Sequence, residues 1–280
     1  MAVDGLNLEV NRGNIFGILG PNGSGKTTTL GIILDVINCT RGEYSWFGEK
    51  PTKAHRKKIG AILETPVFYP YLSGQKNLEI IADIKEVSVD RIDPVIRKVG
   101  LFDRKDDKFK TYSLGMKQRL AIAGALLCDP EVMILDEPTN GLDPQGIADI
   151  KDLIIKIGKE GKTIILASHL LDEVQKVCTH FAVLKKGKML YSGNIEEVTK
   201  GAETVEIETN DESVYEVLQN WERVEKVEKI LNKYAVTLDQ NTKADELNKY
   251  LVDHGMVLSH LVTQRKSLEK QFLEILEESE

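Results

Sequence analysis

The chain has 280 residues, of which 41% are hydrophobic and 29% charged, and its formal net charge is -7. At roughly 150 residues per domain, this length predicts two domains. The composition is that of a globular protein and excludes wholesale disorder, collagen-like repeats and a small disulfide-rich scaffold. Apolar runs such as 15–19 and 132–135 fall well short of the about 18 residues that indicate a membrane-spanning helix.

Neither the chain start nor the cysteine content suggests secretion. The first residues lack a charged start followed by an apolar core, so no secretory signal is expected. The cysteines Cys39, Cys128 and Cys178 are widely spaced and odd in number. They indicate reduced thiols in a cytosolic protein. The alternative, cysteines that are simply packed in the core, leads to the same interpretation.

Charge is distributed unevenly along the chain. Residues 201–280 carry 18 acidic and 9 basic side chains, whereas residues 1–200 carry 26 acidic and 28 basic ones. This shift predicts a domain boundary near residue 200, with domains 1–200 and 201–280. The acidic C-terminal part argues against a nucleic-acid or anionic-lipid surface there, and a solvated acidic surface is the simpler meaning of the charge itself.

Buried strands alternate with helices over the first 200 residues. In chain order, we expect a strand at 14–19, a helix at 26–37, a strand at 43–47, helical structure at 77–99 with breaks near Ser88 and Pro94, a helix at 116–127, a strand at 132–135, a helix at 146–158, a strand at 163–167, a helix at 170–178 and a hairpin formed by 181–184 and 189–191. This alternation predicts a mainly parallel sheet covered on both faces.

The pattern changes after residue 201. Strands are expected at 204–208, 224–231, 234–238 and 257–262, with helices at 212–219 and 244–254 and a last amphipathic helix at 268–276. The order resembles a split β-α-β-β-α-β unit, so a small α+β C-terminal domain is predicted.

The first chemical motif is a phosphate loop. Residues Gly20-Pro21-Asn22-Gly23-Ser24-Gly25-Lys26-Thr27 match the G-x-x-x-x-G-K-[ST] pattern between a predicted strand and a predicted helix. Glycines let successive N–H groups point at the β- and γ-phosphates, and the helix N-terminus adds a positive dipole end. Lys26 supplies a charge to the phosphates and the Thr27 hydroxyl is placed to ligate Mg²⁺. Gly20 to Thr28 is therefore the predicted nucleotide-binding segment; a glycine-rich turn is the alternative.

Two more candidate sites follow buried strands. Strand 132–135 ends in Asp136 and Glu137, and strand 163–167 ends in Ser168-His169. Ligands of open α/β sheets bind at the carboxyl ends of the strands. We therefore expect Asp136 to face Mg²⁺, Glu137 to reach the water that attacks the γ-phosphate, and His169 to sense that phosphate. Taken alone, each is more often structural; their shared edge favours a site.

Together these three motifs predict an ATPase, and the segment between them indicates which kind to expect. Tyr112-Ser113-Leu114-Gly115-Met116-Lys117-Gln118-Arg119 resembles the signature motif of the ATP-binding cassette (ABC) family, and Ser113 lies 23 residues before Asp136. The family's commonest form is Leu-Ser-Gly-Gly-Gln; Ser113 and Gly115 are kept here. The substituted form is similar to cassettes of bacterial drug and bacteriocin exporters. A helix cap would explain Ser113 alone, but not its neighbours.

Further segments carry this resemblance, which covers about residues 1–195. Residues 140–144 are similar to the D-loop, with Asp143, and residues 62–66 occupy the Q-loop, where Glu64 stands in place of the usual glutamine. The Glu64 carboxylate is expected to approach the Mg²⁺ shell. The family's adenine-stacking aromatic lies on a strand before the one that residues 2–10 resemble, so no residue is assigned to it. The C-terminal 80 residues resemble, more weakly, the regulatory tail of exporter-type cassettes.

The resemblance implies an α/β fold: a P-loop NTPase core with a mainly parallel sheet and an antiparallel β subdomain, and a helical signature subdomain at about 72–128. It implies an ATP-hydrolysing subunit of an ABC transporter of the exporter type that uses ATP and Mg²⁺. The implied catalytic residues are Glu137, His169 and Lys26, and the implied metal residues are Thr27, Asp136 and Glu64. Ser113, Gly115 and Asp143 join Gly20 to Thr28 in binding nucleotide.

The implied partners are a second copy of the chain and a membrane permease. Two copies would pair head to tail, with each ATP between Gly20–Thr27 of one and Ser113–Gly115 of the other. A separate transmembrane permease would dock around 64–72, which places the chain in the cytoplasm on the inner face of the cell membrane. No nucleic-acid partner is expected.

Three other classes fit the sequence less well. Soluble cassette ATPases acting on nucleic acid or ribosomes typically carry two cassettes or a long coiled-coil insertion, and neither occurs here. A nucleotide-binding regulator that does not hydrolyse would be expected to lack Lys26, Glu137 or His169. A GTPase is disfavoured because no Asn-Lys-x-Asp motif occurs. Export rather than import rests on family analogy.

Overall fold

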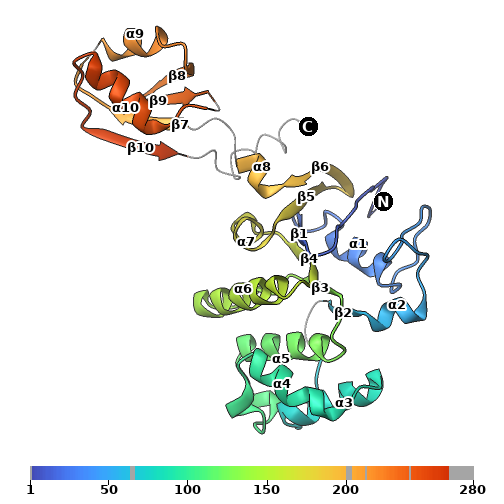
Figure 1. Ribbon diagram of the computed structural model, residues 1–280. Helices are drawn as coiled ribbons and strands as arrows, with labels where there is room; N and C mark the ends of the chain where they lie inside the picture. Colours follow the sequence, from blue (N-terminus) through green and yellow to red (C-terminus); the bar gives the residue numbers. More distant parts are fainter. Residues whose placement is uncertain (1, 64–66, 200–203, 212, 240, 265–280) are drawn as a thin grey trace. The chain divides into compact units, whose positions relative to one another are not determined.

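The computed structural model describes residues 2–63, 67–199, 204–211, 213–239 and 241–264. The chain divides into two compact units, Met1–Gly193 and Asn194–Glu280, each with its own β-sheet (Figure 1). The helix predicted at 268–276 lies outside the described residues. No helix in the described ranges has the length and apolar character needed to cross a membrane.

The first unit is built on a six-stranded mixed sheet of order β2-β3-β4-β1-β5-β6. Its strands are β1 (Ile15–Leu19), β2 (Ile59–Ile62), β3 (Val132–Asp136), β4 (Thr163–Ser168), β5 (His180–Lys185) and β6 (Lys188–Asn194). The pairs β2–β3, β3–β4, β4–β1 and β1–β5 are parallel. Strands β1, β3 and β4 are buried along their whole length, as expected of parallel strands covered on both faces. The predicted α/β fold class is therefore confirmed.

Helices cover both faces of this sheet. The helices of the first unit are α1 (Lys26–Ile33), α2 (Lys53–Lys57), α3 (Gly74–Lys85), α4 (Ile92–Lys98), α5 (Leu114–Leu126), α6 (Pro144–Lys159) and α7 (Leu171–Val177). Leu30 of α1 packs with Phe16 and Ile18 of β1 in one apolar cluster. The residue between them, Gly17, faces the opposite side, where a side chain would meet Val174 of α7 at 2.7 Å. The alternation of strand side chains thus gives each layer its own core.

The segment between β2 and β3 is helical. Helices α3, α4 and α5 contact one another there, joined by short 3-10 turns at Val89–Arg91, Phe102–Arg104 and Phe109–Thr111. The predicted helical signature subdomain is confirmed. The expected helical stretch 77–99 is two helices, separated where Glu86 takes a left-handed φ of 56°. Pro94 lies in the first turn of α4, where a missing N–H costs little, so it does not break that helix.

Two predicted elements near the N-terminus differ. The strand expected at 43–47 is only an isolated antiparallel bridge between Trp46 and Glu49. It closes a tight turn in which Phe47 and Gly48 both have positive φ, which a strand cannot continue through. The helix expected at 26–37 ends at Ile33. Asp35 has a φ of 63°, and the next two amides turn back to the Gly31 carbonyl.

The second unit has a four-stranded antiparallel sheet of order β10-β7-β9-β8. Its elements are α8 (Ile195–Thr199), β7 (Thr204–Glu208), α9 (Val214–Gln219), β8 (Val224–Ile230), β9 (Lys233–Leu238), α10 (Ala244–Asp253) and β10 (His260–Gln264). Alternate residues of β7 and β9, such as Val205 and Val236, form a core with Leu218 of α9 and Leu247 of α10. The β7-α9-β8-β9-α10-β10 succession is the predicted split β-α-β-β-α-β unit.

Candidate nucleotide site

The carboxyl ends of three adjacent strands meet at one edge of the first unit's sheet. In the register of the sheet, Asp136 of β3 and Ile18 of β1 both lie beside Ala167 of β4. Past these positions the chain stays paired: the Glu137 amide donates to the Ala167 carbonyl at 2.9 Å, and the Gly20 amide donates to Ser168 at 3.3 Å. Segments far apart in sequence, the phosphate loop, Asp136-Glu137 and Ser168-His169, are thereby brought together.

The phosphate loop places a buried lysine at the start of α1. Gly25 has a φ of 106°, and a Cβ at this position would lie 2.5 Å from the Ala2 carbonyl oxygen, so the turn requires glycine. Lys26 is 5% exposed. Its Nζ folds back to donate to the carbonyl oxygens of Gly20 at 2.8 Å and Pro21 at 3.3 Å. The ammonium group is therefore fixed over the loop rather than free in solvent.

Glu137 bridges this lysine and the histidine. Its Oε1 lies 3.3 Å from Lys26 Nζ, and its Oε2 lies 2.7 Å from His169 Nδ1. Glu137 has a left-handed φ of 46°, a conformation that costs a non-glycine residue about 1–2 kcal/mol. Strain of this kind persists where the surrounding contacts enforce it and is concentrated at functional sites. A carboxylate between two cationic or hydrogen-bonding groups is suited to hold and polarise a water molecule.

The donor set fits a magnesium nucleotide. Ser24 Oγ is buried within the phosphate loop and has no hydrogen-bond partner among the described residues, so a phosphate oxygen would satisfy it. The exposed Thr27 hydroxyl and the buried Asp136 carboxylate are hard oxygen ligands of the kind that Mg²⁺ prefers. Nowhere in the described ranges, this edge included, do three His, Cys, Asp or Glu side chains converge as a metal site. Glu64, also predicted to reach the metal, lies outside the described residues.

The remaining predicted binding residues form a second cluster, at the N-termini of α5 and α6. Ser113 caps α5, its Oγ accepting the Met116 amide at 3.3 Å. Asp143 caps α6, its Oδ1 accepting the Gly146 amide at 3.2 Å. A side chain added at Gly115 would lie 4.0 Å from the Gly146 Cα, so the two helix starts adjoin. Ser113 and Asp143 are both exposed at positively polarised helix ends.

Sequence reasoning missed one buried acidic residue beside the site. Glu173 of α7 is 3% exposed and accepts hydrogen bonds from the hydroxyls of Thr139 and Ser168. In the sequence, Asp172-Glu173 looks like the pair of acidic residues that commonly begins a helix at the surface. The one sequence feature that could have indicated Glu173 is its position four residues after His169, at the start of the helix that follows β4.

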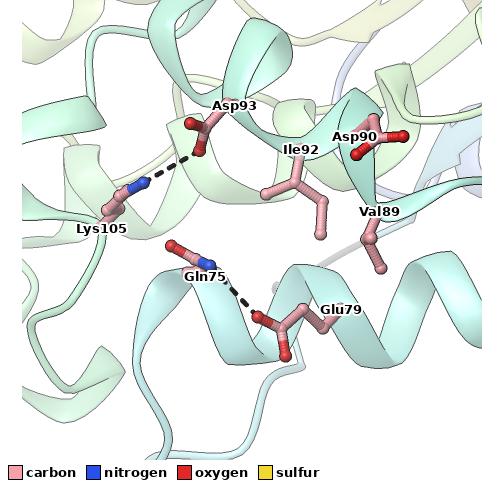
Figure 2. Close-up of a pocket in the computed structure, with 7 residues that line it drawn as sticks. All are labelled: Gln75, Glu79, Val89, Asp90, Ile92, Asp93 and Lys105. Carbon is pink, nitrogen blue, oxygen red and sulfur yellow. Dashed lines mark hydrogen bonds and ion pairs between the residues drawn. The ribbon is translucent and has the colours of Figure 1, made fainter.

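A separate cavity lies within the helical part of the first unit. It has a volume of about 500 Å³ and opens between α3 and the start of α4 (Figure 2). Its lining residues are Gln75, Glu79, Val89, Asp90, Ile92, Asp93 and Lys105. Lys105 pairs with Asp93 at 2.9 Å, and Gln75 with Glu79 at 3.2 Å. None of these residues belongs to the nucleotide motifs, so this cavity is distinct from the site at the strand ends.

Comparison with known proteins identifies the family. Residues 3–140 match the family model described as ABC transporter. The chain is 40% identical to the uncharacterized ABC transporter ATP-binding protein YhcH of Bacillus subtilis (strain 168), over 99% of this chain and 92% of that protein. It is 36% identical to the bacitracin transport ATP-binding protein BcrA of Bacillus licheniformis, over 98% of this chain and 92% of that protein.

A solved structure gives the same result. The chain is similar to cbiO1 from Clostridium perfringens, part of the ABC transporter complex cbiONQ, with a TM-score of 0.64 and 34% identity. That similarity covers 70% of this chain and 83% of the other. The chain therefore belongs to the ABC transporter family, as an ATP-binding and ATP-hydrolysing subunit.

Proposed function

We propose that this chain hydrolyses Mg-ATP at the edge formed by β1, β3 and β4 to drive export through a separate membrane permease. The observation that carries the proposal is the convergence of Lys26, Glu137 and His169, with contacts of 3.3 and 2.7 Å. Export is supported by relatives that span nearly the whole chain and whose names describe bacitracin transport.

Each residue of the site has a separate task. The loop amides and Lys26 hold the β- and γ-phosphates, while Thr27 and Asp136 would hold Mg²⁺, which when bound neutralises phosphate charge. Glu137 orients the attacking water and accepts its proton. His169 contacts the γ-phosphate, and its Nδ1 contact with Glu137 fixes the orientation of the ring.

A second copy of the chain completes the site. The proposal assigns Ser113 and Gly115 of one copy to the γ-phosphate bound by Lys26 of the other. This assignment is supported by their position at the exposed N-terminus of α5. Helix N-termini bind anions through unpaired N–H groups and the helix dipole. Asp143 lies in the segment that would cross between the two copies.

The permease is proposed to dock on the segment that follows Glu64. Val67, Tyr69 and Tyr71 all expose their side chains there. Neighbouring exposed apolar and aromatic side chains mark interaction surfaces more often than isolated ones do. Through this contact the chain would be held at the inner face of the membrane.

The test is ATP hydrolysis by the full chain with Lys26 replaced by alanine. Removing the ammonium group should abolish turnover, because the phosphates lose a charge that the loop positions. Lys98→Ala is the matched control, since Lys98 forms an exposed pair with Glu160 on the surface. Phosphate release near the wild-type rate in Lys26→Ala would reject the site assignment.

A further inference from the structure

A buried carboxylate on α7 connects the two loops that carry the proposed hydrolytic groups. Glu173 is 3% exposed, and its two oxygens are held separately: Oε1 accepts from Thr139 Oγ1, and Oε2 accepts from Ser168 Oγ at 2.8 Å. Thr139 and Ser168 are themselves 4% and 0% exposed. Burying a carboxylate costs folding free energy unless its oxygens are hydrogen-bonded. The two hydroxyl donors offset that cost and are therefore required at these positions.

The protons in this cluster can be assigned from its donors and acceptors. Each of the two hydroxyls donates to one oxygen of the Glu173 carboxyl group. Ser168 Oγ also accepts the Leu170 amide at 3.0 Å, which uses a lone pair and leaves its proton directed at Glu173. Neither hydroxyl can rotate away without leaving a buried donor or acceptor unpaired, and that cost keeps the cluster in a single arrangement.

The two hydroxyls sit next to the hydrolytic residues. Thr139 is two residues after Glu137, in a tight turn closed by the Asn140 amide on the Glu137 carbonyl at 3.1 Å. Ser168 directly precedes His169, at the end of β4. One carboxylate therefore ties the turn after Glu137 to the strand end before His169.

We propose that Glu173 is a positioning residue for ATP hydrolysis. Through Thr139 and Ser168 it sets the spacing between the Glu137 carboxylate and the His169 ring. The inference rests on the hydrolytic roles proposed above for Glu137 and His169. It assigns Glu173 no contact with nucleotide or metal: its partners are the two hydroxyls.

The side-chain contacts of this cluster differ from those that hold Lys26. The Lys26 ammonium is held by the Gly20 and Pro21 carbonyls of the loop between β1 and α1, whereas the Glu173 carboxylate, among the described residues, is hydrogen-bonded only to the Thr139 and Ser168 hydroxyls. The phosphate loop meets Ser168 through the backbone, the Gly20 amide donating to the Ser168 carbonyl, and this bond does not depend on the hydroxyl. Breaking the cluster should lower kcat and leave the KM for Mg-ATP nearly unchanged. Because displacing a catalytic group by about 1 Å can cost about 100-fold in rate, we expect a loss of about 10- to 100-fold in kcat.

The decisive variants are Thr139→Val and Thr139→Ser in the full chain. Valine keeps the shape of threonine but removes the donor, whereas serine keeps the donor and loses one methyl group. Asp172→Asn is the surface control: it changes the neighbouring acidic residue of α7, which pairs with Lys151 and Lys176 at the surface. Steady-state hydrolysis gives kcat and KM for each variant, and thermal melting reports whether each is folded.

A second pair of variants covers the case in which Thr139→Val does not fold. Glu173→Gln keeps the side-chain volume but puts an amide donor opposite hydroxyls that must donate. If both residues act through one contact, the double variant Thr139→Val/Glu173→Gln loses no more kcat than the worse single variant.

The outcomes separate the inference from the proposed function. A low kcat with near-normal KM in Thr139→Val and Glu173→Gln, and near-wild-type kinetics in Thr139→Ser and Asp172→Asn, supports positioning. If Thr139→Val and Thr139→Ser have equal kcat while Glu137→Gln, assayed in parallel, is inactive, the positioning role of Glu173 is overturned and the proposed role of Glu137 stands. Wild-type hydrolysis by Glu137→Gln overturns the proposed role of Glu137 and this inference with it. A rise in KM matching the fall in kcat/KM also overturns positioning.

Discussion

Replacing Glu137 by glutamine removes one negative charge from the space between Lys26 and His169 with little change in volume. In the wild-type chain that carboxylate lies 3.3 Å from Lys26 Nζ and 2.7 Å from His169 Nδ1. An amide oxygen can still accept a hydrogen bond from either group, so the pocket should form. The amide cannot take a proton from water, so hydrolysis should fall by about 10²- to 10⁴-fold, the usual contribution of a general base.

The same substitution should strengthen ATP binding. The Lys26 side chain is only 6% exposed and that of Glu137 21%, so their attraction is poorly screened by water. A hydrogen bond to a charged group contributes about 1.5–3 kcal/mol net, and Glu137 competes with phosphate for the same ammonium. Since about 1.4 kcal/mol corresponds to tenfold in affinity, ATP should bind about 10- to 100-fold more tightly to Glu137→Gln.

Tight binding without hydrolysis should trap the proposed two-copy complex. Size exclusion with light scattering would show a dimer of Glu137→Gln in ATP and a monomer in ADP, which lacks the γ-phosphate assigned to Ser113 and Gly115. Glu131→Gln is the matched control, because Glu131 precedes the opposite end of β3 and pairs with Lys58. Hydrolysis at the wild-type rate would refute the role of Glu137. A variant that binds ATP yet stays monomeric would refute the head-to-tail arrangement.

Three further predictions concern the loop, the C-terminal part and the thiols. Gly25→Ala should destabilise the chain and weaken ATP binding more than Gly23→Ala, measured by melting with and without Mg-ATP. Both have positive φ, which costs alanine about 1–2 kcal/mol, but only at Gly25 does the added Cβ meet backbone, at 2.5 Å. A chain ending at residue 200 should still melt cooperatively and gain stability in Mg-ATP, because every nucleotide motif lies upstream; no shift would reject the boundary. Burial raises the pKa of the Cys178 thiol, so in a Cys39→Ser/Cys128→Ser chain, which keeps only the buried Cys178, a thiol reagent should react only after denaturation, and immediate reaction would contradict that burial.

The convergence of the motif residues at one sheet edge could be predicted from the sequence because it follows from strand direction. Parallel strands put their carboxyl ends at one edge, so Asp136, Glu137 and His169 needed only a correct strand assignment to be placed near the phosphate loop. Their strands, 132–135 and 163–167, were short apolar runs with clear ends. The contact of Lys26 with Glu137 then follows from the adjacency of β3, β4 and β1, which the structure adds.

Features that depend on tertiary packing were not predictable in the same way. Strand β2 was missed because it has four residues and contains Gly60, which in sequence indicates a turn. In the structure a Cβ at Gly60 would lie 2.4 Å from the Ala125 carbonyl oxygen of α5, so glycine is needed for helix approach. Glu173 was missed for a related reason: it is buried against two polar partners, Thr139 and Ser168, which lie 34 and 5 residues away in the chain. A hydrophobic periodicity does not indicate contacts between polar residues.

The two residue clusters of the first unit, one around Glu137 and one around Ser113, are connected within one chain. This connection bears on how the two nucleotide sites of the proposed dimer are related. The turn that begins at Glu137 continues through Gly141 and Leu142 to Asp143 at the start of α6. A Cβ at Gly141 would lie 3.3 Å from the Leu114 side chain, and one at Gly115 would lie 4.0 Å from that of Leu142. The turn after Glu137 therefore lies close to the start of α5, which Ser113 caps. In the proposed dimer Ser113 serves the partner's nucleotide, so this turn would join the hydrolytic residue of one site to the residue assigned to the other.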